Sequence, residues 1–427
     1  MIRTRSFRAA LVLAALIAAP ASGQSVAFVD VNVIPLDRER VLERQTVVVT
    51  GDRIAALGPS SSTAVPAGAT RIDGRGKYLM PGLAEMHAHV VGGGNPNHEQ
   101  LNRDILFLYV ANGITSIRAM LGAPNQIPLR EQLQRGEILG PTMYVSAPSL
   151  NGNSAPNPDS GATLVRAHKA AGYDFLKIHP ALTLATYDAI ARTAKDVDIS
   201  WAGHVPAAVG LRHALASGQS GIDHLDGMLE AATPDATYEQ LRGASPPPLP
   251  QWLDAVDPAR FPSIAAEIKA ANSWQVPTIL VWENLFSQAE TPEQMGTRDE
   301  LRYVSRQARA NYIAQKHNII QGQRNNGATP EVAAKYTELR RRALKALIDA
   351  DAPLLMGTDS PQLFMVPGFA LHRELAIIAS LGVSPFRLYE SGSRNVARYV
   401  ADKLEQDGRF GTVAVGNRAD LVLLDAN

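Results

Sequence analysis

The sequence contains no cysteine among its 427 residues. This absence excludes disulfide bonds, thiolate metal ligands and a cysteine nucleophile. An excess of charge of either sign is also missing, because 41 Lys and Arg residues balance 41 Asp and Glu residues. No segment carries a long basic run, so nucleic-acid binding by counterion release has no electrostatic support.

The N-terminal residues have the composition of a targeting segment. Arg3, Arg5 and Arg8 precede a short apolar run over residues 9–19, which is too short to span a membrane comfortably. Ala21 and Gly23 then supply small residues for a signal-peptidase cut before Gln24. We expect residues 1–23 to be a signal peptide and the mature chain to be exported, periplasmic or secreted, without an integral membrane span. The alternative is an uncleaved N-terminal anchor.

Both ends of the remaining chain resemble β-structure. Residues 26–34 and 44–54 are rich in Val and Ile with polar alternation, which is typical of strands. At the far end of the chain, residues 411–424 resemble further strands that could complete this sheet. We therefore predict a small satellite β-sandwich domain built from residues 24–79 and 408–427.

The chain between these ends alternates short apolar runs with helical patterns. This alternation fits an α/β protein with a (β/α)8 TIM-like barrel over residues 80–407. Two insertions interrupt it, a Pro-rich stretch at 245–250 and a helical stretch at 302–350, either of which could shape a lid or be a plain surface excursion. The candidate strands are Tyr78–Met86, Ile114–Arg118, Thr142–Val145, Phe175–Ile178, Ile199–Ala202, Ser220–Asp223, Val276–Val281 and Pro353–Met356.

A pair of histidines closes the first of these strands. Residues two apart on a strand point to the same face, so His87 and His89 can converge on one metal ion. Neutral imidazole is a good ligand for zinc. Alone, this spacing is weak, because chance or core packing also produces it.

Three further candidates follow other predicted strands. His204 and His224 come just after the fifth and sixth strands, and Asp359 follows the eighth. The C-terminal ends of barrel strands line one face, so these side chains should meet His87 and His89 in one pocket. The alternative for Asp359 is a carboxylate that only supports a turn.

Lys177 closes the fourth predicted strand and has no lone pair as an ammonium. In a buried, cation-rich pocket its pKa should fall, which leaves a reactive amine. Such an amine can take up CO2 and become a carbamate, an anion able to bridge two metals. The alternative is a lysine that extends to solvent.

These residues, in this order, resemble the amidohydrolase superfamily. Gly203-His204-Val205-Pro206 and Ile222-Asp223-His224-Leu225-Asp226-Gly227 are similar to its imidazolonepropionase-like and prolidase-like branch, as are Pro81-Gly82-Leu83 and the residues 416–425. The resemblance spans nearly the whole mature chain. Tails in this family usually continue into further strands of the small domain, so a sequence that stops at Asn427 leaves that domain either truncated or smaller than usual.

The resemblance implies two divalent metal ions, most plausibly Zn2+. His87 and His89 with Asp359 would hold the more buried metal and His204 with His224 the more exposed one, bridged by an N6-carboxylated Lys177. Asp359 would also be the general base that moves a proton from water to the leaving amine.

The implied activity is hydrolysis of a C–N bond in a small-molecule substrate, such as an N-acyl amino acid or a dipeptide, by a protein that we expect to be a homo-oligomer. Hydrolysis of lactones or phosphotriesters and a non-catalytic metal- or ligand-binding barrel are the alternatives.

Three more residues are candidate substrate contacts. Arg118 could receive a substrate carboxylate or form a structural ion pair. His179 shares a strand face with Lys177, so it points to the substrate or packs in the core. Trp282 follows the predicted seventh strand, where it could form an aromatic wall or pack in the core.

Overall fold

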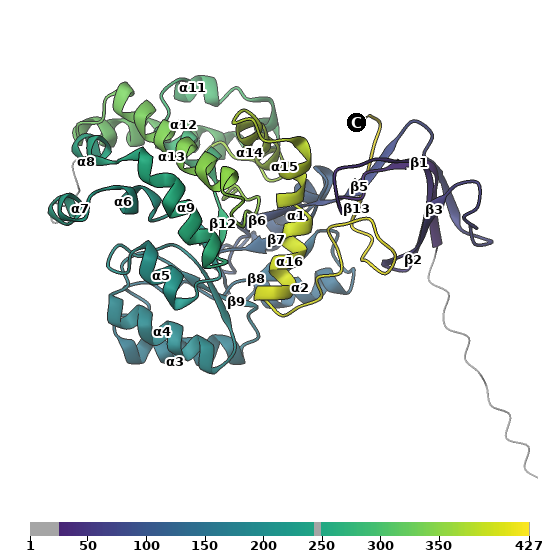
Figure 1. Cartoon of the computed structure of the whole chain (residues 1–427), viewed down its shortest axis with the longest axis horizontal. Coiled ribbons are helices and arrows are strands. Elements are labelled where there is room, and N and C mark those ends of the chain that lie inside the picture. The colour runs from purple at the N-terminus through teal and green to yellow at the C-terminus, as the bar shows by residue number, and fades with distance from the viewer. Residues whose placement is uncertain (1–24, 243–248, 427) are drawn as a thin grey trace, which may run out of the picture.

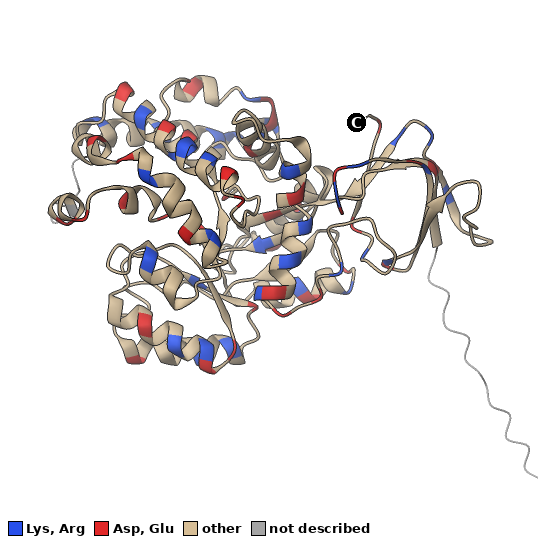
Figure 2. Ribbon diagram, in the orientation of Figure 1, with Lys and Arg blue, Asp and Glu red and all other residues tan. Residues whose placement is uncertain are grey.

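The computed structural model describes residues 25–242 and 249–426. The predicted signal peptide and most of the Pro-rich stretch lie outside these ranges. Figure 1 shows a body of helices around short central strands, with a separate sheet to one side. Lys and Arg alternate with Asp and Glu over the helices, and no face in this view carries a single sign of charge (Figure 2).

The separate sheet joins the two ends of the chain. Its strand order is β13-β5-β1-β2-β3, with β4 paired to β1, and residues such as Val31, Val47 and Ile54 form its small core. The description of this sheet as a β-sandwich domain stays a prediction. Its strands are β1 (Ser25–Val33), β2 (Leu42–Thr50), β3 (Arg53–Pro59), β4 (Thr70–Asp73), β5 (Tyr78–Pro81) and β13 (Leu421–Leu424).

The central strands are parallel. β6 (Leu83–Ala88), β7 (Ile114–Ala119) and β8 (Thr142–Val145) form one sheet; β9 (Phe175–Ile178), β10 (Ser200–Gly203), β11 (Gly221–Asp223) and β12 (Trp274–Val276) form another. Isolated parallel bridges join β8 to β9, β12 to Leu354, and Ser360 back to β6. The pairings therefore run in a ring that brings the carboxyl ends of the strands together.

Helices follow most of these strands and cover the central sheets, which confirms the α/β character of the chain (Figure 1). Apart from two short 3-10 turns, the described helices are α1 (His98–Ala111), α2 (Gln126–Gln134), α3 (Pro158–Ala170), α4 (Leu184–Asp196), α5 (Leu211–Ser217), α6 (Met228–Ala232), α7 (Asp235–Arg242), α8 (Leu249–Ala255), α9 (Phe261–Ala270), α10 (Ile279–Phe286), α11 (Pro292–Met295), α12 (Arg306–Asn325), α13 (Pro330–Asp349), α14 (Phe369–Ala379), α15 (Pro385–Ser391) and α16 (Arg394–Lys403). Within the described ranges, none of these helices is long and apolar enough to span a membrane.

Three predicted strands differ from the structure. The segment 78–86 divides at Gly82 into β5 and β6, which belong to different sheets. The predicted strand Val276–Val281 is wrong beyond Val276, because Thr278 adopts a left-handed φ of 46° and Glu374 accepts the first two N–H groups of α10. Around Pro353–Met356 only Leu354 makes a ladder bridge.

The predicted helical stretch 302–350 divides into α12 and α13 near Gly327, whose φ is 78°. α13 packs against α9 and α10 and buries Tyr336, Leu339 and Arg340. This part of the stretch is therefore core structure rather than a plain surface excursion.

Candidate metal centre

The ring of strand ends brings the predicted histidines together. The ring centroid of His87 lies 4.7 Å from that of His224 and 5.4 Å from that of His89. The ring centroid of His204 lies 4.7 Å from that of His224. The donor atoms of His87, His224 and Asp359 all lie within 4.8 Å of one another. These distances are compatible with a shared cation.

Asp359 reaches this cluster from the loop that follows Leu354. Its Oδ1 lies 2.6 Å from His89 Nε2 and 3.5 Å from His87 Nε2. Burial acts to raise the pKa of Asp359, but the combined opposing effect of His87 and His89 is larger. The pKa is therefore lowered and the carboxylate stays ionised. Both Asp359 and His224 adopt left-handed backbone, with φ of 73° and 64°, which is rare for residues other than glycine. Such strain is concentrated at functional sites.

Lys177 is 1% exposed, so the alternative of a lysine that extends to solvent is wrong. Its Nζ donates to Asp223 Oδ2 at 2.9 Å. Asp223 is fully buried and also accepts from Arg118 at 2.8 Å. Burial acts to raise the pKa of Asp223, but Lys177, His87 and Arg118 together hold it well below its usual range. Asp223 was not predicted as a site residue, although it directly precedes His224 in the sequence.

Arg118 lies beneath the site and is fully buried. Besides Asp223, its guanidinium donates to the carbonyl of Met86 at 2.7 Å and to the Tyr399 hydroxyl at 3.0 Å. It also lies over the rings of Phe175 and Tyr399. This geometry corresponds to the structural ion pair and disfavours the substrate contact that the sequence had also suggested, because no face of the guanidinium reaches solvent.

Hydrogen bonds fix the orientation of two imidazoles. His204 Nδ1 lies 2.8 Å from Asp226 Oδ2, and His224 Nδ1 lies 2.7 Å from Thr278 Oγ1. Each contact occupies Nδ1 and leaves Nε2 as the nitrogen that can ligate a metal. Carboxylate and hydroxyl partners of this kind are typical of metal-ligating histidines. Neither Asp226 nor Thr278 was singled out from the sequence.

A buried acid, Glu85, ties two ligand-bearing segments together. It accepts from the backbone N–H of His87 at 3.0 Å, and from the backbone N–H and hydroxyl of Thr358 at 2.8 and 2.6 Å. Burial raises the pKa of Glu85 to about 8. Glu85 thus couples β6 to the loop that carries Asp359.

The residues present fit divalent metal ions. Nδ1 of His87 and Nδ1 of His89 are buried and make no hydrogen bond with a described residue, although Asp223 Oδ2 lies 3.4 Å from His87 Nδ1. Burial lowers the pKa of His87 to about 4 and that of His224 well below its ordinary value, so both rings are neutral near pH 7. Neutral imidazoles beside an ionised carboxylate form the donor set that zinc prefers.

Two predicted substrate contacts border the cluster. The ring of His179 lies 4.9 Å from that of His204, and burial, reinforced by Lys177, lowers the pKa of His179 to about 3. Trp282 lies edge-on to His224 at 6.1 Å, but it belongs to α10 rather than to the end of a strand. Both side chains are half-buried at the edge of the site.

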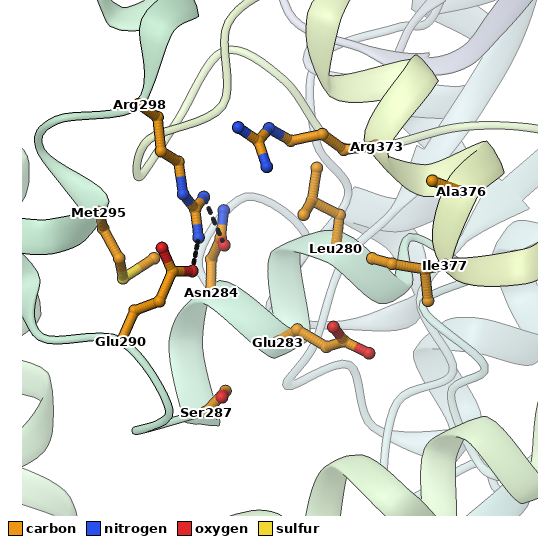
Figure 3. A pocket seen from close by; sticks show the side chains of 10 residues that line it. All are labelled: Leu280, Glu283, Asn284, Ser287, Glu290, Met295, Arg298, Arg373, Ala376 and Ile377. Carbon is orange, nitrogen blue, oxygen red and sulfur yellow. Dashed lines mark hydrogen bonds and ion pairs between the residues drawn. The ribbon is translucent and has the colours of Figure 1, made fainter. Parts of the chain in front are cut away.

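A cavity beside α10 contains none of the predicted site residues. It measures about 250 Å3, and Figure 3 shows Arg298 and Arg373 extending into it above Glu283 and Glu290. Arg298 donates to Glu290 at 2.6 Å and to Asn284 at 3.2 Å, and Arg373 pairs with Glu300. Ion pairs within the protein therefore account for both arginines.

Comparison with known proteins identifies the family. The model of the amidohydrolase family matches residues 78–427. The chain belongs to the amidohydrolase family. It is 33% identical to an imidazolonepropionase of Streptomyces avermitilis over 95 residues, which span 22% of each chain.

Solved structures agree with this family. A bottromycin amidohydrolase shares the fold with a TM-score of 0.69 and 20% identity over 94% of this chain and 82% of its own. A Xaa-Pro dipeptidase with bound methionine has a TM-score of 0.66 and 16% identity over 95% and 93%. The predicted resemblance to the imidazolonepropionase-like and prolidase-like amidohydrolases is confirmed. The family and the solved structures indicate a TIM-barrel-like α/β fold. The family match itself supports a hydrolase of carbon–nitrogen bonds.

Proposed function

We propose that this chain is a binuclear metal-dependent amidohydrolase that cleaves the amide bond of a small substrate, such as an N-acyl amino acid or a dipeptide. The observation that carries the proposal is the convergence of His87, His89, His204, His224 and Asp359 at one end of the parallel strands. The relatedness to an imidazolonepropionase and the shared fold with a Xaa-Pro dipeptidase support a C–N bond as the target.

The proposed metal ions divide the cluster into two sites. His87, His89 and Asp359 would hold one ion and His204 with His224 the other, and a carboxylated Lys177 would bridge them. The neutral imidazoles favour Zn2+. Bound there, the ions would polarise the scissile carbonyl and lower the pKa of a water molecule.

Asp359 has the properties of the proton carrier. Its pKa lies below the usual range of a carboxyl, so the group is ionised near pH 7 and its oxygens carry no proton. In the proposed reaction this carboxylate would accept a proton from water. The same proton would then pass to the amine nitrogen as the C–N bond breaks. The water oxygen remains on the acyl carbon, so the products are a carboxylic acid and an amine.

The rest of the site orients these groups. Asp226 fixes the ring of His204, and Thr278 fixes that of His224. Glu85 accepts from the backbone N–H groups of His87 and Thr358 and so holds these two segments together. Trp282 and His179 border the cluster and would contact the substrate on either side of its amide. A preorganised arrangement of this kind needs no rearrangement when the substrate enters.

Two structural assignments accompany this function. We propose that the ring of parallel pairings is a (β/α)8 barrel, with the sheet of the two chain ends as its satellite domain. We also propose that residues 1–23 are removed on export. Sequencing the N-terminus of the protein from the exported fraction tests the second point, since a mature chain beginning at Gln24 is expected.

The activity is tested with the full chain purified in the presence of Zn2+ and bicarbonate. About two zinc equivalents per chain are expected by elemental analysis. The same protein is then assayed against dipeptides, N-acyl amino acids, lactones and phosphotriesters. Cleavage of amides above the other classes supports the proposal. Absence of bound metal, or hydrolysis of lactones or phosphotriesters alone, overturns it.

A further inference from the structure

Arg340 is a buried arginine that extends from α13 to the metal cluster. It is 5% exposed, and one of its terminal nitrogens donates to the backbone carbonyl of His224. The other terminal nitrogen donates to the Tyr336 hydroxyl at 3.2 Å. Its guanidinium lies 4.3 Å from the ring centroid of Trp282, the residue whose ring edge faces His224. Arg340 therefore contacts both the backbone of a candidate ligand and the aromatic side chain beside it.

The backbone that Arg340 contacts is unusual. His224 and Leu225 are consecutive non-glycine residues with left-handed φ of 64° and 53°, and Gly227 follows with 81°. Consecutive left-handed residues of this kind are strained and persist only where the surrounding structure fixes them. The backbone N–H of His224 donates to the carbonyl of Val276 at 2.8 Å, and its ring forms a hydrogen bond with Thr278. Arg340 supplies the contact at the carbonyl.

We propose that Arg340 is a positioning residue that holds His224 and Leu225 in their left-handed conformation and so aims His224 into the cluster. The ligand role of His224 rests on the proposed function, whereas the support of its backbone does not. α13 would then be part of the machinery that builds the centre. Its contribution is made through the main chain of His224 rather than through contact with substrate.

The chemistry of arginine suits this position. A guanidinium is planar, so it can stack its face on Trp282 while its edge donates in plane to His224 and Tyr336. Lysine carries the same charge but has no planar fork, so it cannot make all three contacts at once. Arg341, the next residue on α13, offers a matched control, because its side chain is 40% exposed and its guanidinium pairs with Glu283 rather than with His224.

Hydrogen exchange of the metal-free full chain tests the backbone support directly. The informative amides are those of His224, Asp226 and Met228. They donate to the carbonyls of Val276, Asp223 and Leu225, respectively. In Arg340→Met these amides should exchange at least tenfold faster than in the wild type, and Arg340→Lys should be intermediate. Arg341→Met should leave them unchanged. Equal protection in Arg340→Met and Arg341→Met overturns the proposal.

Titration with Co2+ or Zn2+ tests the consequence for the centre. Arg340→Met should bind metal at least tenfold more weakly than Arg341→Met, with a changed visible spectrum of bound Co2+. A lower melting temperature with unchanged affinity and spectrum would show a merely structural role and would refute the proposal. If Arg340→Met fails to fold, Arg340→Lys carries the same comparison. If the wild type binds no metal, the proposed function fails, and the exchange experiment still decides the role of Arg340.

Discussion

Lys177 Nζ lies 2.9 Å from Asp223 Oδ2, and both side chains are buried. The second oxygen of Asp223 is already bound to Arg118 at 2.8 Å. Asp223 therefore joins a permanently charged guanidinium to the lysine that we propose is carboxylated. On carboxylation, Lys177 would exchange its positive charge for a negative one, and Arg118 would remain to balance Asp223.

The role of Lys177 is tested by Lys177→Ala. If a carboxylated Lys177 bridges two metals, this substitution should remove at least half of the bound metal and nearly all activity. Short carboxylic acids such as acetate should restore part of both, because they supply the missing carboxylate. Elemental analysis and an amide hydrolysis assay provide the measurements. Lys169→Ala is the control, because Lys169 is exposed. Full activity of Lys177→Ala would show that no carbamate is needed.

Asp359→Asn separates turnover from metal binding. The amide keeps an oxygen beside His89 but cannot accept the proton, so kcat should fall by about 100-fold or more. Much of the bound metal should remain, because His87 and His224 are untouched. Turnover and metal content are measured on the same sample. Retention of kcat in Asp359→Asn would rule out this carboxylate as the base.

Asp226→Asn addresses the orientation of His204. Loss of the charged partner 2.8 Å from Nδ1 should weaken metal affinity by about 10- to 100-fold, the usual effect of removing such a partner. Competition with a chelator measures the affinity. Asp188→Asn is a matched control, because Asp188 makes a comparable contact of 2.6 Å to His213 outside the centre. Equal effects of both substitutions would contradict the assignment.

Glu374 predicts a pH dependence of stability. Burial raises its pKa to about 8 from the ordinary value of 4.5, although the N–H groups of Leu280 and Ile279 act to lower it. The folded state therefore binds the proton more tightly than the unfolded state. The free energy of unfolding should fall as pH rises from about 4.5 to about 8, by up to about 1.4 kcal/mol per pH unit.

Glu374→Gln should reduce this slope, since the amide does not titrate, and Glu85, whose pKa burial also raises to about 8, should maintain part of it. Denaturant unfolding at several pH values between 5 and 8 measures it. Glu338→Gln, at a position whose side chain is 68% exposed, should leave the wild-type slope unchanged. A slope in Glu374→Gln equal to that of the wild type would assign the pH dependence to other groups.

Except for Asp359, which a loop carries, the candidate ligands could be predicted because each lies in or directly after a short apolar strand that is recognisable on its own. The ends of β9, β10 and β11 place Lys177, His204 and His224 with little help from side-chain detail. The order of residues along the chain therefore predicts the convergence, and the ring of parallel pairings produces it.

The contacts behind the ligands could not be predicted in this way. Arg118 is paired with Asp223, which lies 105 residues further along the chain, and Arg340 meets His224 across 116 residues. Nothing local in the sequence marks such pairs. The same limit explains why α10 was predicted as a strand. Its apolar residues resemble a strand in the sequence, but in the structure Glu374, which is distant in the sequence, accepts its first two N–H groups. Tertiary contacts override local propensity there.

The sheet shared by the two chain ends has a kinetic consequence. β5 pairs with β13, and the side chains of Lys77 and Asp425, which are 348 positions apart in the sequence, meet at 2.5 Å. During synthesis, β1, β2 and β3 emerge first and can pair locally, and β5 can then join β1, but the other edge of β5 must wait for nearly all of the remaining polypeptide. Closing so long a loop is entropically costly and delays the last pairing step. Until then the edge of β5 is open to pairing with other chains, so the nascent protein is most prone to aggregation just before its final strand arrives.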